Sequence, residues 1–321
     1  FISHFEDYAK SVIKRLNLQK GSLVIDVGSN DGIGLKPFVD LGFKNVQGIE
    51  PAKNLAELAN KNGINTFHGY LGDKALNPIR NGADLLLASN VFAHADDLKS
   101  MAESMKSLIK PNGKIIIEVQ YLLNTIRDLT FDNIYHEHTN YWSLSSLDLF
   151  FEKLDLKIFK AEKIDTHGGS IRVYISPDKN ILLDKSIKTL LDEEKNFGLG
   201  KLSTYLEFGK KIQNLKNKVI NNIKKLKDKN ENIVGYGAPA KATTALNFFN
   251  IGKEIKYIIE DNELKHGKFV PGVKIPIISK DNLTVKDPQI LVLAWNFYEE
   301  IKIKNNKLFK DIINIKDLEK D

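Results

Sequence analysis

The stretch Gly21–Phe43, with the sequence GSLVIDVGSNDGIGLKPFVDLGF, decides the fold of the first half of the chain. Within it, Leu23–Val27 is a short apolar run next to glycines, a pattern typical of a buried parallel strand. A glycine-containing turn, Gly28–Gly32, comes next, and apolar residues then recur at helical spacing over Leu35–Leu41. A strand, a glycine turn and a helix in this order begin a nucleotide-binding α/β unit.

The residues around this turn indicate which ligand it binds. Its glycines allow the backbone to approach a ligand closely, and a second short strand, NVQGIEP, brings Glu50 to the position of a ribose-binding carboxylate. The turn departs from the dinucleotide pattern G-x-G-x-x-G, because Asn30 replaces the second glycine. Asp26 is unfavourable beside a phosphate and suits a cationic ligand. These features favour S-adenosylmethionine over NAD, with a purely structural turn as the alternative. The predicted cofactor site comprises Asp26, Gly28, Asn30, Asp31, Gly32, Glu50, Pro51 and Asn90.

The alternation of strands and helices continues after this unit. A predicted strand at Leu85–Ala88 leads to Asn90 and His94. A helix and the turn KPNGK then precede a strand at Lys114–Val119. This order resembles the sequence that leads into the fifth strand of class I methyltransferases, so we expect Lys114–Val119 to be that strand. Ligands of open α/β sheets bind beyond the carboxyl ends of the strands, so we expect these polar residues near the cofactor.

The stretch FDNIYHEHTNYWSL, Phe131–Leu144, follows that fifth strand and allows three interpretations. His136 and His138 alternate like metal ligands on a strand, with His94 or His167 to complete a site. Buried, structural histidines are the second interpretation. The third, which we favour, is acid–base chemistry, in which a histidine removes a proton and a tyrosine hydroxyl stabilises an oxyanion. No metal ligand is therefore predicted.

Composition limits the class of protein. The 321 residues suggest about two domains, and 42% hydrophobic with 27% charged residues is ordinary for a globular protein. No apolar run reaches the roughly 20 residues of a membrane helix. Without cysteine the chain forms no disulfides, which agrees with a cytoplasmic enzyme. The net charge of +6 comes without an aromatic and basic nucleic-acid motif, and suits an anionic substrate instead.

The second half of the chain predicts a hairpin, two helices and another α/β unit. The hairpin contains a strand at Ser170–Ile175, and the helices span about Ile181–Phe197 and Lys201–Lys229. The stretch ENIVGYGAPAKATTALNFF then repeats the order of strand, glycine turn and helix. Backbone amides at this helix start, together with Lys241, are suited to an anion such as the diphosphate of a nucleotide sugar. Further strands end at Glu260 and Asp261 and in QILVLAW, ahead of Asn296.

Several motifs in order along the chain resemble one family. These are NVFAH, FDNIYHEHTNYWSLSSL, THGGSIRVYI, GYGAPAKATTALNFF, KHGKFVPGVKIPI and LAWNFYEEI. Together they resemble the sugar C-methyltransferases of deoxysugar biosynthesis, in particular the C-3′-methyltransferases of the tetronitrose type that act on dTDP-linked 4-keto sugars. The resemblance covers nearly the whole chain.

The resemblance implies roles for individual residues. His138 would abstract the proton beside the ketone, Tyr135 would stabilise the enolate or position the sugar, and Glu137 would tune the histidine or touch the substrate. His94 would be a further active-site residue. The expected contacts with the nucleotide-diphosphate sugar are Tyr141, His167, Gly169, Ser170, Arg172, Tyr236, Ala238, Lys241 and Asp261.

The resemblance also implies a domain organisation. We expect a class I methyltransferase domain with the catalytic loop over residues 1–158 and an α/β domain for the nucleotide sugar over residues 159–321. The family usually begins with a cysteine-rich zinc domain, which this sequence lacks, and Phe1 in place of Met suggests that its beginning is missing. An O- or N-methyltransferase and a non-catalytic sugar-nucleotide-binding protein remain alternatives.

Overall fold

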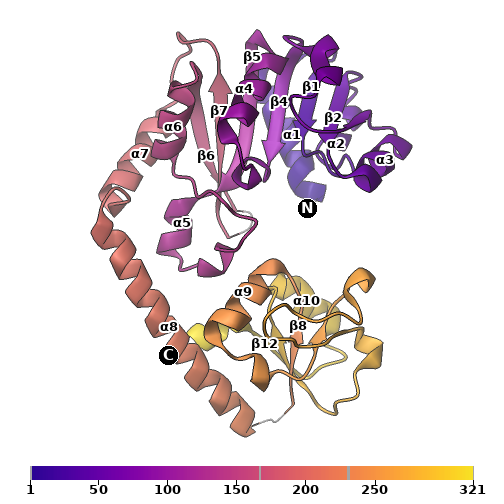
Figure 1. Cartoon of the computed structure of the whole chain (residues 1–321), viewed down its shortest axis with the longest axis vertical. Helices are drawn as coiled ribbons and strands as arrows, with labels where there is room; N and C mark the ends of the chain where they lie inside the picture. Colours follow the sequence, from indigo (N-terminus) through magenta and orange to yellow (C-terminus); the bar gives the residue numbers. More distant parts are fainter. Residues whose placement is uncertain (1, 166–167, 230–231, 321) are drawn as a thin grey trace. The chain divides into compact units, whose positions relative to one another are not determined.

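The computed structural model describes residues 2–165, 168–229 and 232–320. Two compact α/β units make up this structure (Figure 1). What we call the first unit comprises Phe1–Leu123 and Thr139–Gly200, and the second unit comprises Asn124–His138 and Lys201–Asp321. Within the described residues, no helix combines the length and the apolar character that crossing a bilayer requires.

The first unit is built on a mixed sheet with the strand order β3-β2-β1-β4-β5-β7-β6. The pairs within β1–β5 are parallel, whereas β7 is antiparallel to both β5 and β6. This order, with an antiparallel β7 next to β5, is that of the class I methyltransferase fold and confirms the predicted fold class. The strands are β1 Val24–Val27, β2 Val46–Glu50, β3 Thr66–His68, β4 Ala83–Ser89, β5 Ile109–Gln120, β6 Lys157–Ile164 and β7 Ser170–Ser176.

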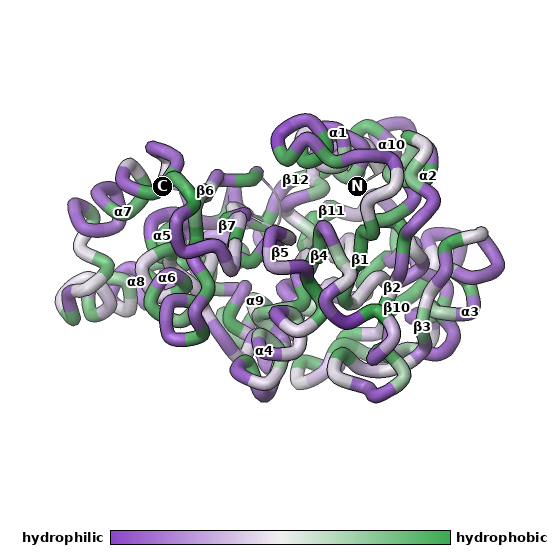
Figure 2. The backbone as a smooth tube through the Cα atoms, turned by 90° about the horizontal axis from the view of Figure 1, so that it is seen from above, coloured by the Kyte–Doolittle hydropathy of each residue, from purple (hydrophilic) through white to green (hydrophobic). Residues whose placement is uncertain are grey.

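Apolar faces of helices cover this sheet. Tyr8 and Val12 of α1 and Phe38 of α2 pack against Leu85 and Leu87 of β4, all of them buried. Figure 2 shows β1 and β4 in the green of hydrophobic residues, as expected for central strands that are buried on both faces. The helices that begin in this unit are α1 Ile2–Leu16, α2 Lys36–Asp40, α3 Lys53–Lys61, α4 Leu98–Leu108, α5 Leu122–Arg127, α6 Leu144–Glu152 and α7 Lys185–Phe197.

The second unit has a parallel sheet with the strand order β10-β9-β8-β11-β12. Its core joins the strands to buried residues of α8 and α9, among them Val219, Leu246 and Phe249. The second α/β unit expected from the sequence is therefore present. Its elements are α8 Leu202–Lys229, β8 Ile233–Tyr236, α9 Ala240–Phe249, β9 Ile258–Ile259, β10 Ile277–Ile278, β11 Gln289–Val292, α10 Tyr298–Asn305 and β12 Asp311–Asn314.

The compact units divide the chain differently from the expected boundary at residue 158. The hairpin β6–β7 belongs to the first unit, because β7 pairs with β5 over Ile115–Gln120. The segment Asn124–His138, expected to be part of the methyltransferase domain, belongs to the second unit. The helix expected from Ile181 begins instead at Lys185, where the carboxylate of Asp184 accepts a hydrogen bond from a backbone N–H of the first turn.

Candidate active site

A cavity of about 870 Å³ opens in the first unit at the carboxyl ends of β1, β2 and β4. It is lined by the glycine turn after β1, by the end of β2 and by the loop after β4. Gly32 does not line it, and faces Ile64 on the other side of the turn. The predicted residues that line the cavity are Asp26, Gly28, Asn30, Asp31, Glu50, Pro51, Asn90 and His94.

Backbone hydrogen bonds fix Glu50 at the rim of the turn. Its Oε2 accepts from the N–H of Asn30 at 2.9 Å, and its Oε1 accepts from the N–H of Ala52 at 2.8 Å. Gly28 adopts a φ of +67°, and a Cβ there would come within 2.4 Å of Val91, so glycine is required at this position. Each carboxylate oxygen of Glu50 has a second lone pair, so each can also accept a hydrogen bond from a ribose hydroxyl.

The charge of the cavity wall is negative. Asp26, Asp31, Glu50 and Asp97 line it, whereas no lysine or arginine is found among the described residues that do so. Asp26 is 7% exposed, and burial, with a further contribution from the negative charge of Glu50, raises its pKa to about 7. A ligand with a positive charge would favour the ionised form of Asp26 and would offset its repulsion from Glu50. The wall therefore fits S-adenosylmethionine, which has a ribose, an ammonium group and a sulfonium but no phosphate.

Hydrogen bonds from Thr139 and Asn140 hold the loop that carries His94. The hydroxyl of Thr139 donates to the carbonyl oxygen of Ala93 at 3.2 Å, and the Asn140 side chain donates to that of Ala95 at 3.3 Å. The residues that follow the motif YHEH thus fix the backbone on both sides of a histidine in the cavity wall.

Tyr135 and His138 form a hydrogen-bonded pair. Nδ1 of His138 lies 2.7 Å from the carbonyl oxygen of Asn133, so this nitrogen carries the hydrogen and donates it. With the hydrogen of the ring on Nδ1, Nε2 is the acceptor nitrogen, and the hydroxyl of Tyr135, 3.1 Å away, donates to it. The rings are 4.1 Å apart between centroids, and His138 is 8% exposed. This arrangement presents a basic nitrogen beside a hydroxyl.

His136 and Glu137, which lie between Tyr135 and His138 in the sequence, are exposed, unlike buried His138. The side chain of His136 is 88% exposed, and its Nε2 lies 3.9 Å from a carboxylate oxygen of Glu137, itself well exposed. The group that fixes the tautomer of His138 is the carbonyl of Asn133. That Glu137 tunes the histidine or touches the substrate stays a prediction. Among the residues that the structure describes, no group of three or more His, Asp and Glu side chains could hold a metal ion.

The segment that carries Tyr135 and His138 is anchored within the second unit. Phe131 packs against Phe248 and Phe249 of α9, with ring centroids 4.8 and 5.2 Å apart. The carboxylate of buried Asp132 accepts a 2.6 Å hydrogen bond from the indole N–H of Trp295, which follows β11. These contacts place the proposed acid–base pair on the unit that the sequence assigned to the nucleotide sugar.

The second glycine turn, after β8, lies among polar and cationic groups. The hydroxyl of Tyr236 donates to Asp261 at 2.9 Å, and the N–H of Ala238 donates to Glu260 at 2.9 Å. Lys241, in the first turn of α9, lies over the ring of Trp295 with its Nζ 4.9 Å from the centroid. Burial of this ammonium group is the main cause that lowers its pKa.

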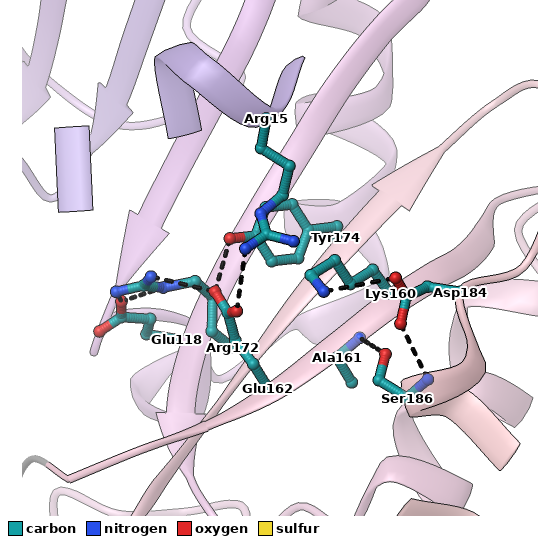
Figure 3. A network of polar contacts seen from close by, with 9 residues as sticks. All are labelled: Arg15, Glu118, Lys160, Ala161, Glu162, Arg172, Tyr174, Asp184 and Ser186. Atoms are coloured by element: carbon teal, nitrogen blue, oxygen red, sulfur yellow. Dashed lines mark hydrogen bonds and ion pairs between the residues drawn. The ribbon is translucent and has the colours of Figure 1, made fainter. Parts of the chain in front are cut away.

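Arg172 holds a position that differs from the expected contact with the sugar. It is 5% exposed and pairs with the buried carboxylate of Glu118 and with Glu162 at 3.2 Å (Figure 3). The guanidinium also lies over the ring of Tyr8. Because burial of a charge is tolerated only with such partners, we interpret Arg172 as a residue that ties β7 to its neighbouring strands.

The remaining expected substrate residues of this region differ in how they are placed. Ser170 is buried at the start of β7, and the carbonyl oxygen of Gly169 accepts from the N–H of Tyr121 at 3.1 Å. Tyr141 is partly buried, which raises the pKa of its hydroxyl. His167 lies outside the described residues.

Several residues of the site escaped the sequence reasoning. Asn133 acts through its backbone carbonyl, which no side-chain pattern reveals. Asp132 and Trp295 both lie in the quoted motifs, but they are 163 positions apart, so the sequence did not predict their hydrogen bond. Glu260 was named only as a strand end, although it comes at the end of the strand that follows the second glycine turn, as Glu50 does after the first.

Comparisons with known proteins agree with a methyltransferase domain followed by a second domain. Residues 1–161 match the model of a methyltransferase domain, and residues 165–313 match that of a C-methyltransferase C-terminal domain. The C-methyltransferase NovU of Streptomyces niveus is 33% identical over 318 residues, which cover 96% of this chain and 74% of that protein.

Solved structures are similar to the chain over about half of its length. A putative methyltransferase of Haloferax volcanii, in complex with the Trm112 activator, has a TM-score of 0.46 at 18% identity and covers 55% of this chain and 94% of its own. The magnesium protoporphyrin IX methyltransferase of Synechocystis PCC 6803, with bound SAH, has a TM-score of 0.44 at 14% identity, with 55% and 83% covered. From the two family models and the NovU match, we conclude that this chain belongs to the C-methyltransferases, enzymes whose methyl donor is S-adenosylmethionine.

Proposed function

We propose that this C-methyltransferase methylates the carbon next to the ketone of a nucleotide-diphosphate 4-keto deoxysugar. The resemblance of its motifs to sugar C-methyltransferases implies this substrate, with a thymidine nucleotide as the expected form. The observation that carries the proposal is the pair formed by Tyr135 and His138, in which an imidazole nitrogen lies 3.1 Å from a phenolic oxygen. Such a pair supplies the base and the hydrogen-bond donor that proton removal beside a ketone requires.

The proton transfer follows from this geometry. The carbon next to the ketone loses its proton to Nε2 of His138, and the electrons of the C–H bond form the enolate. The carbonyl of Asn133 continues to accept the hydrogen of Nδ1, and so stabilises the imidazolium that results. The hydroxyl of Tyr135 turns from Nε2 to the enolate oxygen, because a substrate proton directed at Nε2 displaces it.

The methyl donor would be held in the cavity of the first unit. Glu50 would accept the ribose hydroxyls, Asp26 would face the ammonium group, and the turn from Gly28 to Asn30 would contact the donor with its backbone. When bound, S-adenosylmethionine supplies an electrophilic methyl group on a sulfonium sulfur. His94 lines the same cavity, and we assign it to the part of the active site nearest the donor.

The nucleotide sugar would be bound by residues around the second glycine turn. Lys241 and the amides at the start of α9 would contact the diphosphate, since both present positive charge to an anion. We assign Glu137 and Tyr141 to contacts with the sugar, in line with the family resemblance.

The experiment is a labelled methyl-transfer assay. The enzyme is incubated with S-adenosylmethionine carrying a ¹³C methyl group and a panel of nucleotide-diphosphate 4-keto deoxysugars, and NMR locates the new methyl. We expect a methyl carbon bonded to the ring carbon next to the ketone, and a loss of roughly 100-fold or more in rate with His138→Gln. His136→Gln is the matched control, because this exposed neighbour has no role in the pair. A methyl on oxygen or nitrogen, or full activity of His138→Gln, would refute the proposal.

A further inference from the structure

The two units share one local structure at their glycine turns. In each sheet a central strand is followed by a glycine with positive φ, +67° at Gly28 and +87° at Gly237. Each glycine N–H donates at 2.8 Å to a carbonyl at the end of the neighbouring parallel strand, that of Ile49 in β2 and that of Ile259 in β9. The turns therefore correspond residue for residue at this point.

A carboxylate occupies the same place beside both turns. Glu260 follows Ile259 as Glu50 follows Ile49. Oε2 of Glu260 accepts from the N–H of Ala238 in the turn at 2.9 Å, and Oε1 accepts from the N–H of Asn262, two residues onward, at 3.0 Å. Glu50 makes two similar bonds at 2.9 and 2.8 Å, to a turn N–H and to the N–H two residues onward. The turn donor is the second residue after the glycine in the first unit and the first residue after it in the second unit. A carboxylate in this position beside a glycine turn is the ribose-binding group of nucleotide-binding α/β units.

The charges around the two carboxylates differ in sign. Asp26 stands two positions before the first glycine, where the second turn has Gly235. Two lysines lie beside the second turn. Nζ of Lys265 is 3.4 Å from Oε2 of Glu260 and 3.0 Å from the carbonyl oxygen of Ala238, and Lys241 lies in the first turn of α9. The first turn thus suits a cationic nucleoside, and the second suits a nucleoside with phosphates.

The surroundings of Glu260 favour its ionised form, a carboxylate that only accepts hydrogen bonds. Burial opposes its ionisation, but the two backbone N–H donors and Lys265 outweigh burial and lower its pKa. Asp261, which we expected in the nucleotide site, is turned to Tyr236 at 2.9 Å and to Lys304 at 2.7 Å. Glu260 rather than Asp261 is therefore the carboxylate that corresponds to Glu50.

We propose that Glu260 accepts a hydrogen bond from the ribose 3′-hydroxyl of the nucleotide substrate, so that the second unit binds the nucleoside as the first unit binds that of the methyl donor. This inference rests on the proposed function for the presence of a nucleotide, and adds the residue that recognises its sugar. A ribonucleoside would place its second hydroxyl at the other carboxylate oxygen, since each oxygen of Glu260 accepts from a backbone N–H as each oxygen of Glu50 does.

The test is a binding cycle on the full chain, measured by isothermal titration calorimetry. The ligands are thymidine diphosphate or guanosine diphosphate, whichever the wild type binds more tightly, and its 3′-deoxy counterpart. We expect Glu260→Gln to weaken binding of the hydroxylated nucleotide by roughly 10- to 100-fold, as for a lost hydrogen bond to a charged group. Wild type should lose a similar factor with the 3′-deoxy nucleotide, and the variant should bind both nucleotides alike.

Each other outcome overturns the inference in a recognisable way. If Glu260→Gln weakens both nucleotides by the same factor, the carboxylate only shapes the turn, and the proposed function stands without it. If the wild type binds neither diphosphate, the nucleotide site itself is wrong. Glu263→Gln is the matched control, since this exposed glutamate lies on the same loop and should leave both affinities unchanged.

Discussion

Replacement of Asp26 by asparagine should stabilise the protein without cofactor at alkaline pH while it weakens the binding of the methyl donor. The carboxyl of Asp26 is buried in β1 at 7% exposure, and its pKa is raised from 3.8 to about 7 by burial and by Glu50. Between these two pH values the folded protein keeps a proton that the unfolded chain has released. The contribution of Asp26 to stability is therefore complete below pH 3.8 and is lost as the pH rises through about 7.

The size of the effect follows from the shift. Each pKa unit corresponds to about 1.4 kcal/mol, so a rise from 3.8 to about 7 lowers the free energy of unfolding by about 4 kcal/mol at alkaline pH. An asparagine at this position does not titrate, so its contribution to the free energy of unfolding does not fall as the pH rises. We expect Asp26→Asn to match the wild type near pH 4 and to exceed its stability by up to about 4 kcal/mol near pH 8.

Urea unfolding of the two proteins at pH 5 and pH 8, without cofactor, measures this difference. The transition that belongs to the first unit is the one that S-adenosylmethionine shifts to higher urea concentration in the wild type. Asp31→Asn is the matched control, because its carboxylate lines the same cavity but is only partly buried. A stability difference between Asp26→Asn and wild type that stays constant from pH 5 to pH 8 would refute the reasoning.

Three further substitutions test other parts of the structure. Arg172→Ala leaves the carboxylate of Glu118 buried without its guanidinium partner and should lower the free energy of unfolding by about 3–5 kcal/mol; a loss below 1 kcal/mol in urea titration would contradict this. Glu50→Gln should weaken S-adenosylmethionine roughly 10- to 100-fold in calorimetry, because a charged acceptor of ribose hydroxyls is lost, and unchanged affinity would remove Glu50 from the site. Trp295→Phe removes the donor to Asp132 and should destabilise the second unit by about 1–3 kcal/mol with a lower kcat; an unaltered melting temperature and kcat would show that this bond does not position the catalytic segment.

Local patterns in the sequence predicted which residues would gather at the glycine turn of the first unit. An apolar strand, a glycine turn and an acidic residue at the end of the next strand are close together in the chain, and their physics is local. Gly28 and Glu50 consequently lie where the pattern places them, in the wall of one cavity. The choice of S-adenosylmethionine over NAD depended on Asn30 in place of the second glycine and on Asp26, and the structure shows both in a wall without lysine or arginine among its described residues.

Contacts between distant parts of the chain determined what the sequence could not show. The strand expected at Ser170–Ile175 is present, but its sequence did not show that Glu118 and Tyr8 would enclose the guanidinium of Arg172. Proximity along the chain suggested that Asn124–His138 belongs with the methyltransferase domain. Packing of apolar rings against α9 and the hydrogen bond between Asp132 and Trp295 assign it to the second unit, and such long-range contacts leave no local pattern.

The most direct test of the central claim is the exchange of the substrate proton beside the ketone in D₂O. With S-adenosylhomocysteine in the donor site no methyl can be transferred, so NMR reports proton removal alone. We predict that wild type and His136→Gln exchange this proton at the same rate, and that His138→Gln loses roughly 100-fold or more. Exchange at the wild-type rate in His138→Gln would contradict the assignment of His138 as the base that starts the reaction.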